Sequence, residues 1–107
     1  MVNTTLGKLE DLFEMAVYAA ADCPKWLDKT GGVEHEGGNS YRYSGFLTCT
    51  NNGRVDYGRW RGKFRREVET DSEAKEMGVV ITCIDIAKDE DYLPAEADLT
   101  IFFTLAP

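Results

Sequence analysis

The sequence has no long apolar run, only three cysteines and a single histidine. Its longest strongly apolar stretches, residues 79–86 and 99–105, fall far short of the roughly 20 residues that a membrane-spanning helix needs, so we expect no membrane segment. The cysteines, at positions 23, 49 and 83, are odd in number and widely separated. That pattern is typical of reduced thiols rather than of a disulfide framework, and the first residues lack the basic and apolar regions of a secretory signal. We therefore expect a cytoplasmic protein.

The same scarcity argues against a metal centre and a catalytic site. The cysteines and His35 could supply four zinc ligands in number, but structural zinc sites take their ligands in closely spaced pairs, and the sequence has none. His35 lies between two glutamates in a glycine-rich segment, without a partner that would make it a catalytic base, so an exposed histidine is the simpler interpretation. The acids between residues 89 and 98 lack the alternation of a calcium-binding loop. We expect no metal, no cofactor and no enzymatic activity.

The composition is that of a small globular domain with an uneven charge distribution. Of the 107 residues, 43% are apolar and 29% are charged, which is enough for one core, so we expect a single domain over residues 1–107. The net charge is −7. Residues 54–66 hold six cations against one acid, a net charge of +5, which leaves −12 for the rest of the chain. The pattern predicts an acidic body with one basic segment.

Local patterns predict a long helix near the start of the chain. Apolar residues recur at helical spacing from Leu6 to Ala20, with charged residues on the other side. Residues 22–30 could form a short second helix. Residues 31–40 contain four glycines and no apolar periodicity, which predicts a surface loop.

Residues 41–50 and 54–68 are predicted to form a β-hairpin, because Asn52-Gly53 between them favours a two-residue type I′ turn. In that register one face is apolar, with large rings opposite glycines. The other face is basic and aromatic, the combination on which single-stranded nucleic acids stack and bind. Alternatively, its long cations only solvate an exposed strand pair. The members of this face are Arg42, Phe46, Tyr57, Arg59, Arg61 and Lys63.

The rest of the chain completes an α+β fold. Residues 70–78 read as a polar connection of about one helical turn, residues 79–86 as a central strand, and residues 99–105 as a half-buried final strand. We expect an N-terminal helix packed on a four-stranded, mainly antiparallel sheet. This order is similar in topology to the cystatin/monellin type of helix grasp. The similarity rests on no sequence motif and implies nothing about protease inhibition.

Three functions fit these patterns. The first is a protein-binding module: an inhibitor, an immunity-type protein or an adaptor that meets a larger, basic or nucleic-acid-binding partner through Glu10, Asp11 and Glu14 on the first helix. The second is nucleic-acid binding through the basic face of the 41–68 hairpin. The third is a structural subunit, for example of a phage-type particle, that assembles through strand edges. The acidic surface and the lack of catalytic motifs favour the first, and the oligomeric state is left open.

Overall fold

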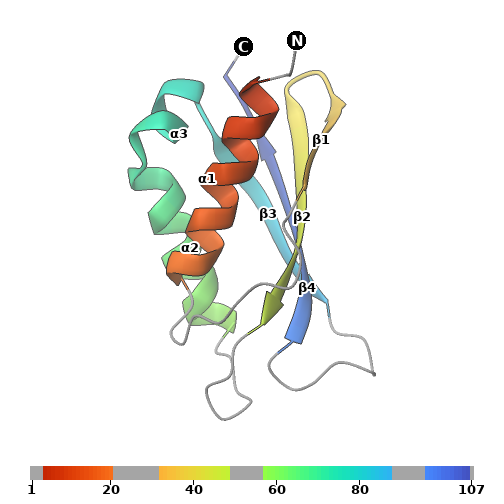
Figure 1. Ribbon diagram of the computed structural model, residues 1–107, viewed down its shortest axis with the longest axis vertical. Coiled ribbons are helices and arrows are strands. Elements are labelled where there is room, and N and C mark those ends of the chain that lie inside the picture. Colours follow the sequence, from red (N-terminus) through yellow and green to blue (C-terminus); the bar gives the residue numbers. More distant parts are fainter. Residues whose placement is uncertain (1–3, 21–31, 49–56, 88–95, 107) are drawn as a thin grey trace.

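The structure is a computed structural model that describes residues 4–20, 32–48, 57–87 and 96–106. The strands of this part form one antiparallel sheet, and the helices cover one of its faces (Figure 1). The predicted α+β class is therefore confirmed. No helix among these residues is long and apolar enough to cross a membrane. In chain order the elements are α1 (Thr4–Ala20), β1 (Gly32–Gly37), β2 (Ser40–Thr48), α2 (Tyr57–Thr70), α3 (Ser72–Met77), β3 (Val80–Ala87) and β4 (Glu96–Thr104).

The sheet has the strand order β1-β2-β4-β3, so β2 and β4 are central and β1 and β3 are the edges. In the chain, β2 follows β1 and β4 follows β3. Helix α1 precedes the first pair of strands, and helices α2 and α3 precede the second. The fold is thus two α-β-β halves joined along β2 and β4. The cystatin/monellin-like order is not confirmed, because α2 and α3 stand between β2 and β3. The strands predicted at 79–86 and 99–105 are present as β3 and β4, but β3 is an edge and not the predicted central strand.

Helix α1 forms as its apolar spacing predicts. Leu9, Phe13, Ala16 and Val17 stand at positions i, i+4, i+7 and i+8, the spacing of one helix face, and all four are buried. They lie along one stripe of the helix, which contacts β1, β2 and α2. The short helix considered for residues 22–30 lies outside the described residues.

Helix α2 overturns the predicted hairpin. Residues 57–70 are helical, so the second strand of that hairpin is wrong, whereas Asn52-Gly53 lies outside the described residues. Trp60, Phe64 and Val68 are spaced by four residues, which places them on one face of a strand and equally on one face of a helix. The arginines, lysine and glutamates between them have good helix propensity. In the helix all three apolar side chains are buried, and the basic side chains stay outside the core.

A tight hairpin replaces the loop predicted for residues 31–40. Strand β1 pairs with β2, with Val33 opposite Tyr43 on the buried face. Two of the four glycines that predict a loop, Gly37 and Gly38, lie at the turn of this hairpin, and Gly32 begins β1. Gly37 and Gly38 have φ angles of 119° and 55°, which side chains with a Cβ rarely adopt.

The predicted polar connection at 70–78 contains the short helix α3. Asp71 is its N-cap, and its carboxylate accepts a hydrogen bond from the backbone N–H of Ala74 at 3.0 Å. Gly78 ends the helix in the left-handed region, with φ of 68°. A Cβ at Gly78 would lie 2.3 Å from the Cβ of Ala106, so the chain end beyond β4 also requires glycine here.

The core lies between the helices and the sheet, and Phe13 is at its centre. The Phe13 ring is fully buried, and its centroid lies 4.6 Å from that of Phe103, 5.4 Å from that of Tyr43 and 5.9 Å from that of Phe64. One side chain of α1 therefore touches β2, β4 and α2. Such ring pairs add stability beyond the apolar area that they bury.

Replacing Phe13 by alanine should destabilise the protein by about 3–5 kcal/mol, because it removes a buried ring and leaves a cavity that its neighbours cannot fill. Urea unfolding followed by circular dichroism measures this. The matched control is Met15→Ala on the same helix, where the side chain is 73% exposed, and the expected change is below about 0.5 kcal/mol. Equal losses for the two variants would contradict the assignment of Phe13 to the centre of the core.

Candidate functional site: an acidic flank and a basic helix

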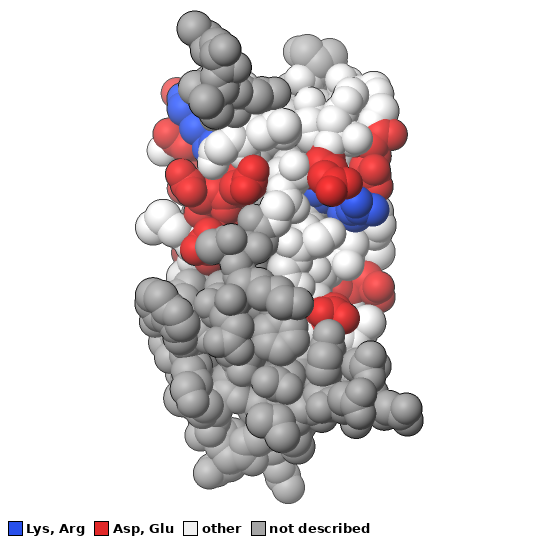
Figure 2. All heavy atoms as spheres, turned by 45° about the vertical axis from the view of Figure 1, so that its right-hand side comes forward, with Lys and Arg blue, Asp and Glu red and all other residues white. Residues whose placement is uncertain are grey.

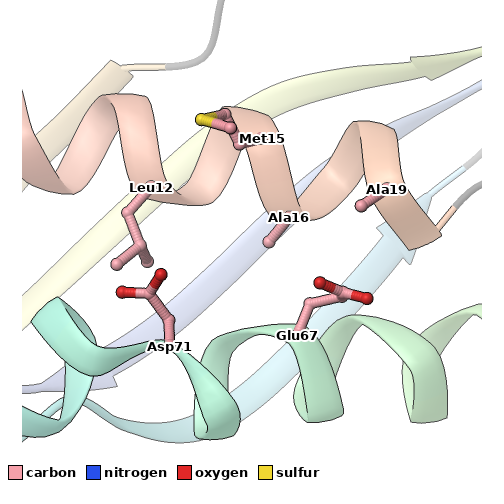
Figure 3. A pocket seen from close by; sticks show the side chains of 6 residues that line it. All are labelled: Leu12, Met15, Ala16, Ala19, Glu67 and Asp71. Carbon is pink, nitrogen blue, oxygen red and sulfur yellow. The ribbon is translucent and has the colours of Figure 1, made fainter.

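Helix α1 packs against α2 along a side that carries small and apolar residues. Leu12, Ala16 and Ala19 line a groove between the two helices, with Glu67 and Asp71 on the opposite wall (Figure 3). Since a helix turns about 100° per residue, Glu10 and Glu14 lie on the other side of α1, away from α2. The element next to α1 on that side is β1, which α1 contacts.

This side of the molecule gathers acidic side chains from two elements. Figure 2 shows acidic side chains over α1, with a basic side chain at their upper end, and others over the β1–β2 hairpin, with a basic side chain among them. Asp11, Glu34 and Glu36 are exposed, and Glu10 and Glu14 are half-buried. We call this surface the acidic flank; it consists of Glu10, Asp11 and Glu14 on α1 and Glu34 and Glu36 on β1.

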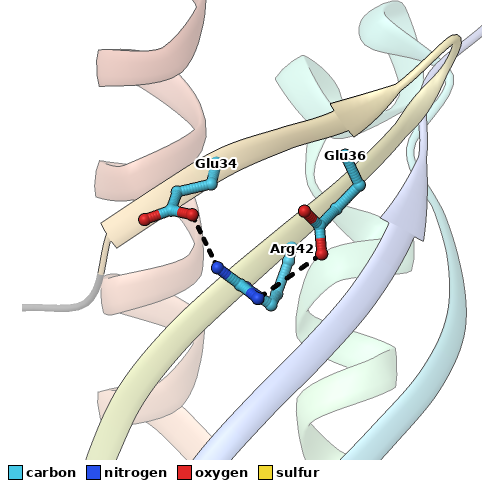
Figure 4. Close-up of polar contacts among 3 residues, drawn as sticks. All are labelled: Glu34, Glu36 and Arg42. Carbon is cyan, nitrogen blue, oxygen red and sulfur yellow. Dashed lines mark hydrogen bonds and ion pairs between the residues drawn. The ribbon is translucent and has the colours of Figure 1, made fainter.

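Arg42 on β2 is a cation that pairs with the β1 part of the acidic flank. Its guanidinium Nη2 lies 2.6 Å from the carboxylate of Glu34, and its Nη1 lies 3.5 Å from that of Glu36 (Figure 4). The two glutamates are two residues apart on β1, so they project to the same face of the sheet and hold Arg42 between them. Counted together, the five acids and Arg42 carry a net charge of −4, so the flank stays strongly negative.

Helix α2 carries the opposite charge. Its buried stripe is Trp60, Phe64 and Val68, and its cations occupy the remaining surface. Arg65 marks the side that faces the sheet edge, because its Nη1 donates a hydrogen bond of 3.5 Å to the backbone carbonyl of Ile81 on β3. The cations of this basic helix are Arg59, Arg61, Lys63, Arg65 and Arg66.

The groove between the helices has an apolar wall and an acidic one. Its volume is about 150 Å³, the scale of a single side chain. Asp71 is already occupied as the N-cap of α3, and Met15 projects outward at the rim. The groove is therefore better explained as the seam between two packed helices than as a ligand site.

Among the described residues, no helix covers the face of the sheet opposite α1 and α2, which we call the open face. A hollow of about 420 Å³ lies on it, around the half-exposed ring of Phe102. Cys83 borders this hollow and is exposed, and Cys49 lies outside the described residues. Within the described part of the chain, no three His, Cys, Asp or Glu side chains converge as they would around a metal ion.

The predicted basic face is not assembled. Arg42 projects from β2 to the open face of the sheet, because its neighbour Tyr43 is buried under the helices. The other cations of that face, Arg59, Arg61 and Lys63, lie on α2, which covers the opposite face. Of the two aromatic members, Tyr57 is the first residue of α2 and Phe46 is paired with Asp98 on β4. The acids predicted on the first helix, Glu10, Asp11 and Glu14, do share α1.

The sequence predicts a loop for Glu34, His35 and Glu36, so it does not predict the contribution of β1 to the acidic flank. The available signal was the pair Gly37-Gly38 between the alternating segments 33–36 and 40–43, which is itself a hairpin pattern. His35 is exposed on β1, its Nε2 lies 2.7 Å from the carbonyl of Gly38, and its ring packs against Tyr41. These contacts give His35 a place in the hairpin turn.

Comparison with protein-family models, with curated proteins and with solved structures finds no match to this chain.

Removing the cation of the acidic flank should cost little stability. We expect Arg42→Met to lower the free energy of unfolding by at most about 1 kcal/mol, because ion pairs of half-exposed side chains are screened by water. Urea unfolding at low and high salt measures the loss, which should shrink as salt rises. Lys75→Met on α3 is the matched control. A loss of several kcal/mol would mean that Arg42 is a structural element of the sheet.

Proposed function

We propose that the protein is a protein-binding module that presents its acidic flank to a basic surface of a larger partner. The observation that supports this proposal is the collection of five carboxylates from α1 and β1 on one side of the molecule, while the cations of α2 lie elsewhere. Opposite charges on two proteins raise their association rate and exclude partners of the wrong sign.

The backbone of β1 strengthens the proposal. Strand β1 is an edge of the sheet and is paired with β2 on one side only. An edge strand offers free N–H and C=O groups to a strand of a partner. Basic side chains on such a partner strand would meet Glu34 and Glu36, and those of a neighbouring element would meet Glu10 and Glu14.

The acidic flank is suited to a partner that normally binds an anion. A protein with a basic, nucleic-acid-binding surface already holds its cations in place for phosphates, and carboxylates on a rigid helix and strand can occupy the same positions. An inhibitor, an immunity-type protein or an adaptor would act in this way by covering that surface.

Reversing two charges of the flank should abolish partner binding. We expect Glu10→Lys with Glu14→Lys to lose a partner that the unaltered protein captures from a nuclease-treated lysate of its source at low salt, because the flank then repels cations. Mass spectrometry of the captured proteins measures the loss. Raising the salt concentration should release the same partner from the unaltered protein.

The matched control is Glu73→Lys with Glu76→Lys, which reverses two exposed acids on α3. They lie beside Lys8, on the side of α1 opposite Glu10 and Glu14. It should retain the partner. A partner captured equally by both double variants, or one indifferent to salt, would refute the acidic flank as the binding surface.

A second candidate is nucleic-acid binding by α2, which five cations between residues 59 and 66 favour. We expect Arg59→Glu with Arg61→Glu to abolish retention on single-stranded RNA at low salt, because phosphate contacts dominate such binding. Fluorescence anisotropy with a labelled oligonucleotide measures it. If the unaltered protein fails to bind at low salt, or if the variant binds equally well, this candidate is wrong.

A further inference from the structure

The two charged surfaces lie at opposite edges of one sheet. The acidic flank is formed by α1 and β1, and β1 is one edge. The cations of α2 lie beside β3, the other edge, to which Arg65 is hydrogen-bonded. We propose that the acidic flank of one copy docks on the α2–β3 side of a second copy, so that copies join side by side. The inference rests on the proposed function of the acidic flank and names its partner as this same chain.

The helical parts of the two surfaces match in spacing. Glu10 and Glu14 are four residues apart on the β1 side of α1. Arg61 and Arg65 are four residues apart on α2, and Arg65 lies about 160° around the helix from Glu67, which faces α1. Residues four apart on a helix surface are neighbours about 6 Å apart. Two carboxylates on one copy can therefore meet two guanidinium groups on the next copy in register.

The strand directions are also compatible with a side-by-side contact between two copies. Every neighbouring pair in the order β1-β2-β4-β3 is antiparallel, so β1 runs antiparallel to β3. A second copy in the same orientation would thus present β3 antiparallel to β1, and the alternation of the sheet would continue across the contact. Arg65 and the irregularity between Ile81 and Cys83 occupy the start of the β3 edge, which leaves its second half for β1.

The charge match between copies is the one between the helices. Asp85 on β3 is paired with Thr100 and lies between the inward-facing Ile84 and Ile86, so it projects to the open face of the sheet and not toward α2. Glu34 and Glu36 project to that open face as well, so the attraction comes from Glu10 and Glu14 with Arg61 and Arg65. On the outer side and the β3 side of α2, the negative charge of Glu69 offsets only part of the positive charge of the five cations.

The signs of the charges on the two surfaces favour one way of joining two copies. Acidic flank against acidic flank would oppose five carboxylates to five, and α2 against α2 would oppose cations to cations. Only the contact between the acidic flank and the α2–β3 side pairs opposite signs. Such a contact uses two different surfaces, so it leaves one of each free and continues into a closed ring or an open filament.

Sedimentation velocity at low salt and rising protein concentration tests the proposal. The unaltered chain should exceed its monomer mass of 12.0 kDa in a concentration-dependent way. Glu10→Arg with Glu14→Arg, and separately Arg61→Glu with Arg65→Glu, should each weaken the association by about tenfold or more, because attraction at two pairs becomes repulsion. An equimolar mixture of the two variants should regain it, since each supplies the charge that the other has lost.

Circular dichroism establishes that each variant is folded, and the α3 variant Glu73→Lys with Glu76→Lys should associate like the unaltered chain. A monomer at all concentrations and salts would overturn the proposal. So would association that survives either reversal, or reversed variants that do not rescue each other in the mixture. Rescue by mixing is expected because the reversed α1 residues of one variant then face the reversed α2 residues of the other.

Different experimental results would contradict the proposed function and the proposed self-association. If the chain remains monomeric but still captures a basic protein through Glu10 and Glu14, self-association is wrong and the protein-binding function stands. If the chain assembles as proposed and captures no other protein through those residues, its partner is its own second copy.

Discussion

The fold depends on the packing of one ring, Phe13, against three others. Tyr43 and Phe103 lie on the two central strands, and Phe64 lies on the second helix, so this cluster joins both α-β-β halves at one point. The same contact places α1 beside α2 on one face of the sheet. Every charged surface of the protein takes its position from that arrangement, because the polar sides of both helices are set by where their apolar stripes are buried.

Charge separation follows from this packing. The small residues of α1 face α2, so Glu10 and Glu14 lie on the β1 side of α1. Glu67 of α2 faces α1, so Arg65 lies at the β3 edge. A chain with a net charge of −7 thus has a strongly acidic edge and a basic one. Such polarity favours ordered contacts over random association, because only one relative orientation of two surfaces brings opposite charges together.

Several elements could be predicted from the sequence because their patterns had one interpretation. The apolar spacing from Leu6 to Ala20 fits a helix alone, and the alternation in residues 99–105 fits a strand alone. The segment around Trp60, Phe64 and Val68 was ambiguous, since a spacing of four residues suits both structures. The Asn52-Gly53 turn signal then favoured the strand. The glycine-rich segment 31–40 predicts a loop because it holds four glycines and has no apolar periodicity.

The sequence by itself determined the α+β class, the first helix, the last two strands and the presence of a basic segment in an acidic chain. These follow from local periodicity and from counts of charge, which need no knowledge of distant contacts. Only the tertiary structure decided that the basic segment is a helix, that β1 exists, and that Arg42 belongs with Glu34 and Glu36 rather than with Arg59. The reason is that each of these depends on which face is buried. Burial is decided by packing between residues far apart in the chain, such as Phe13 with Phe103, and local pattern does not contain it.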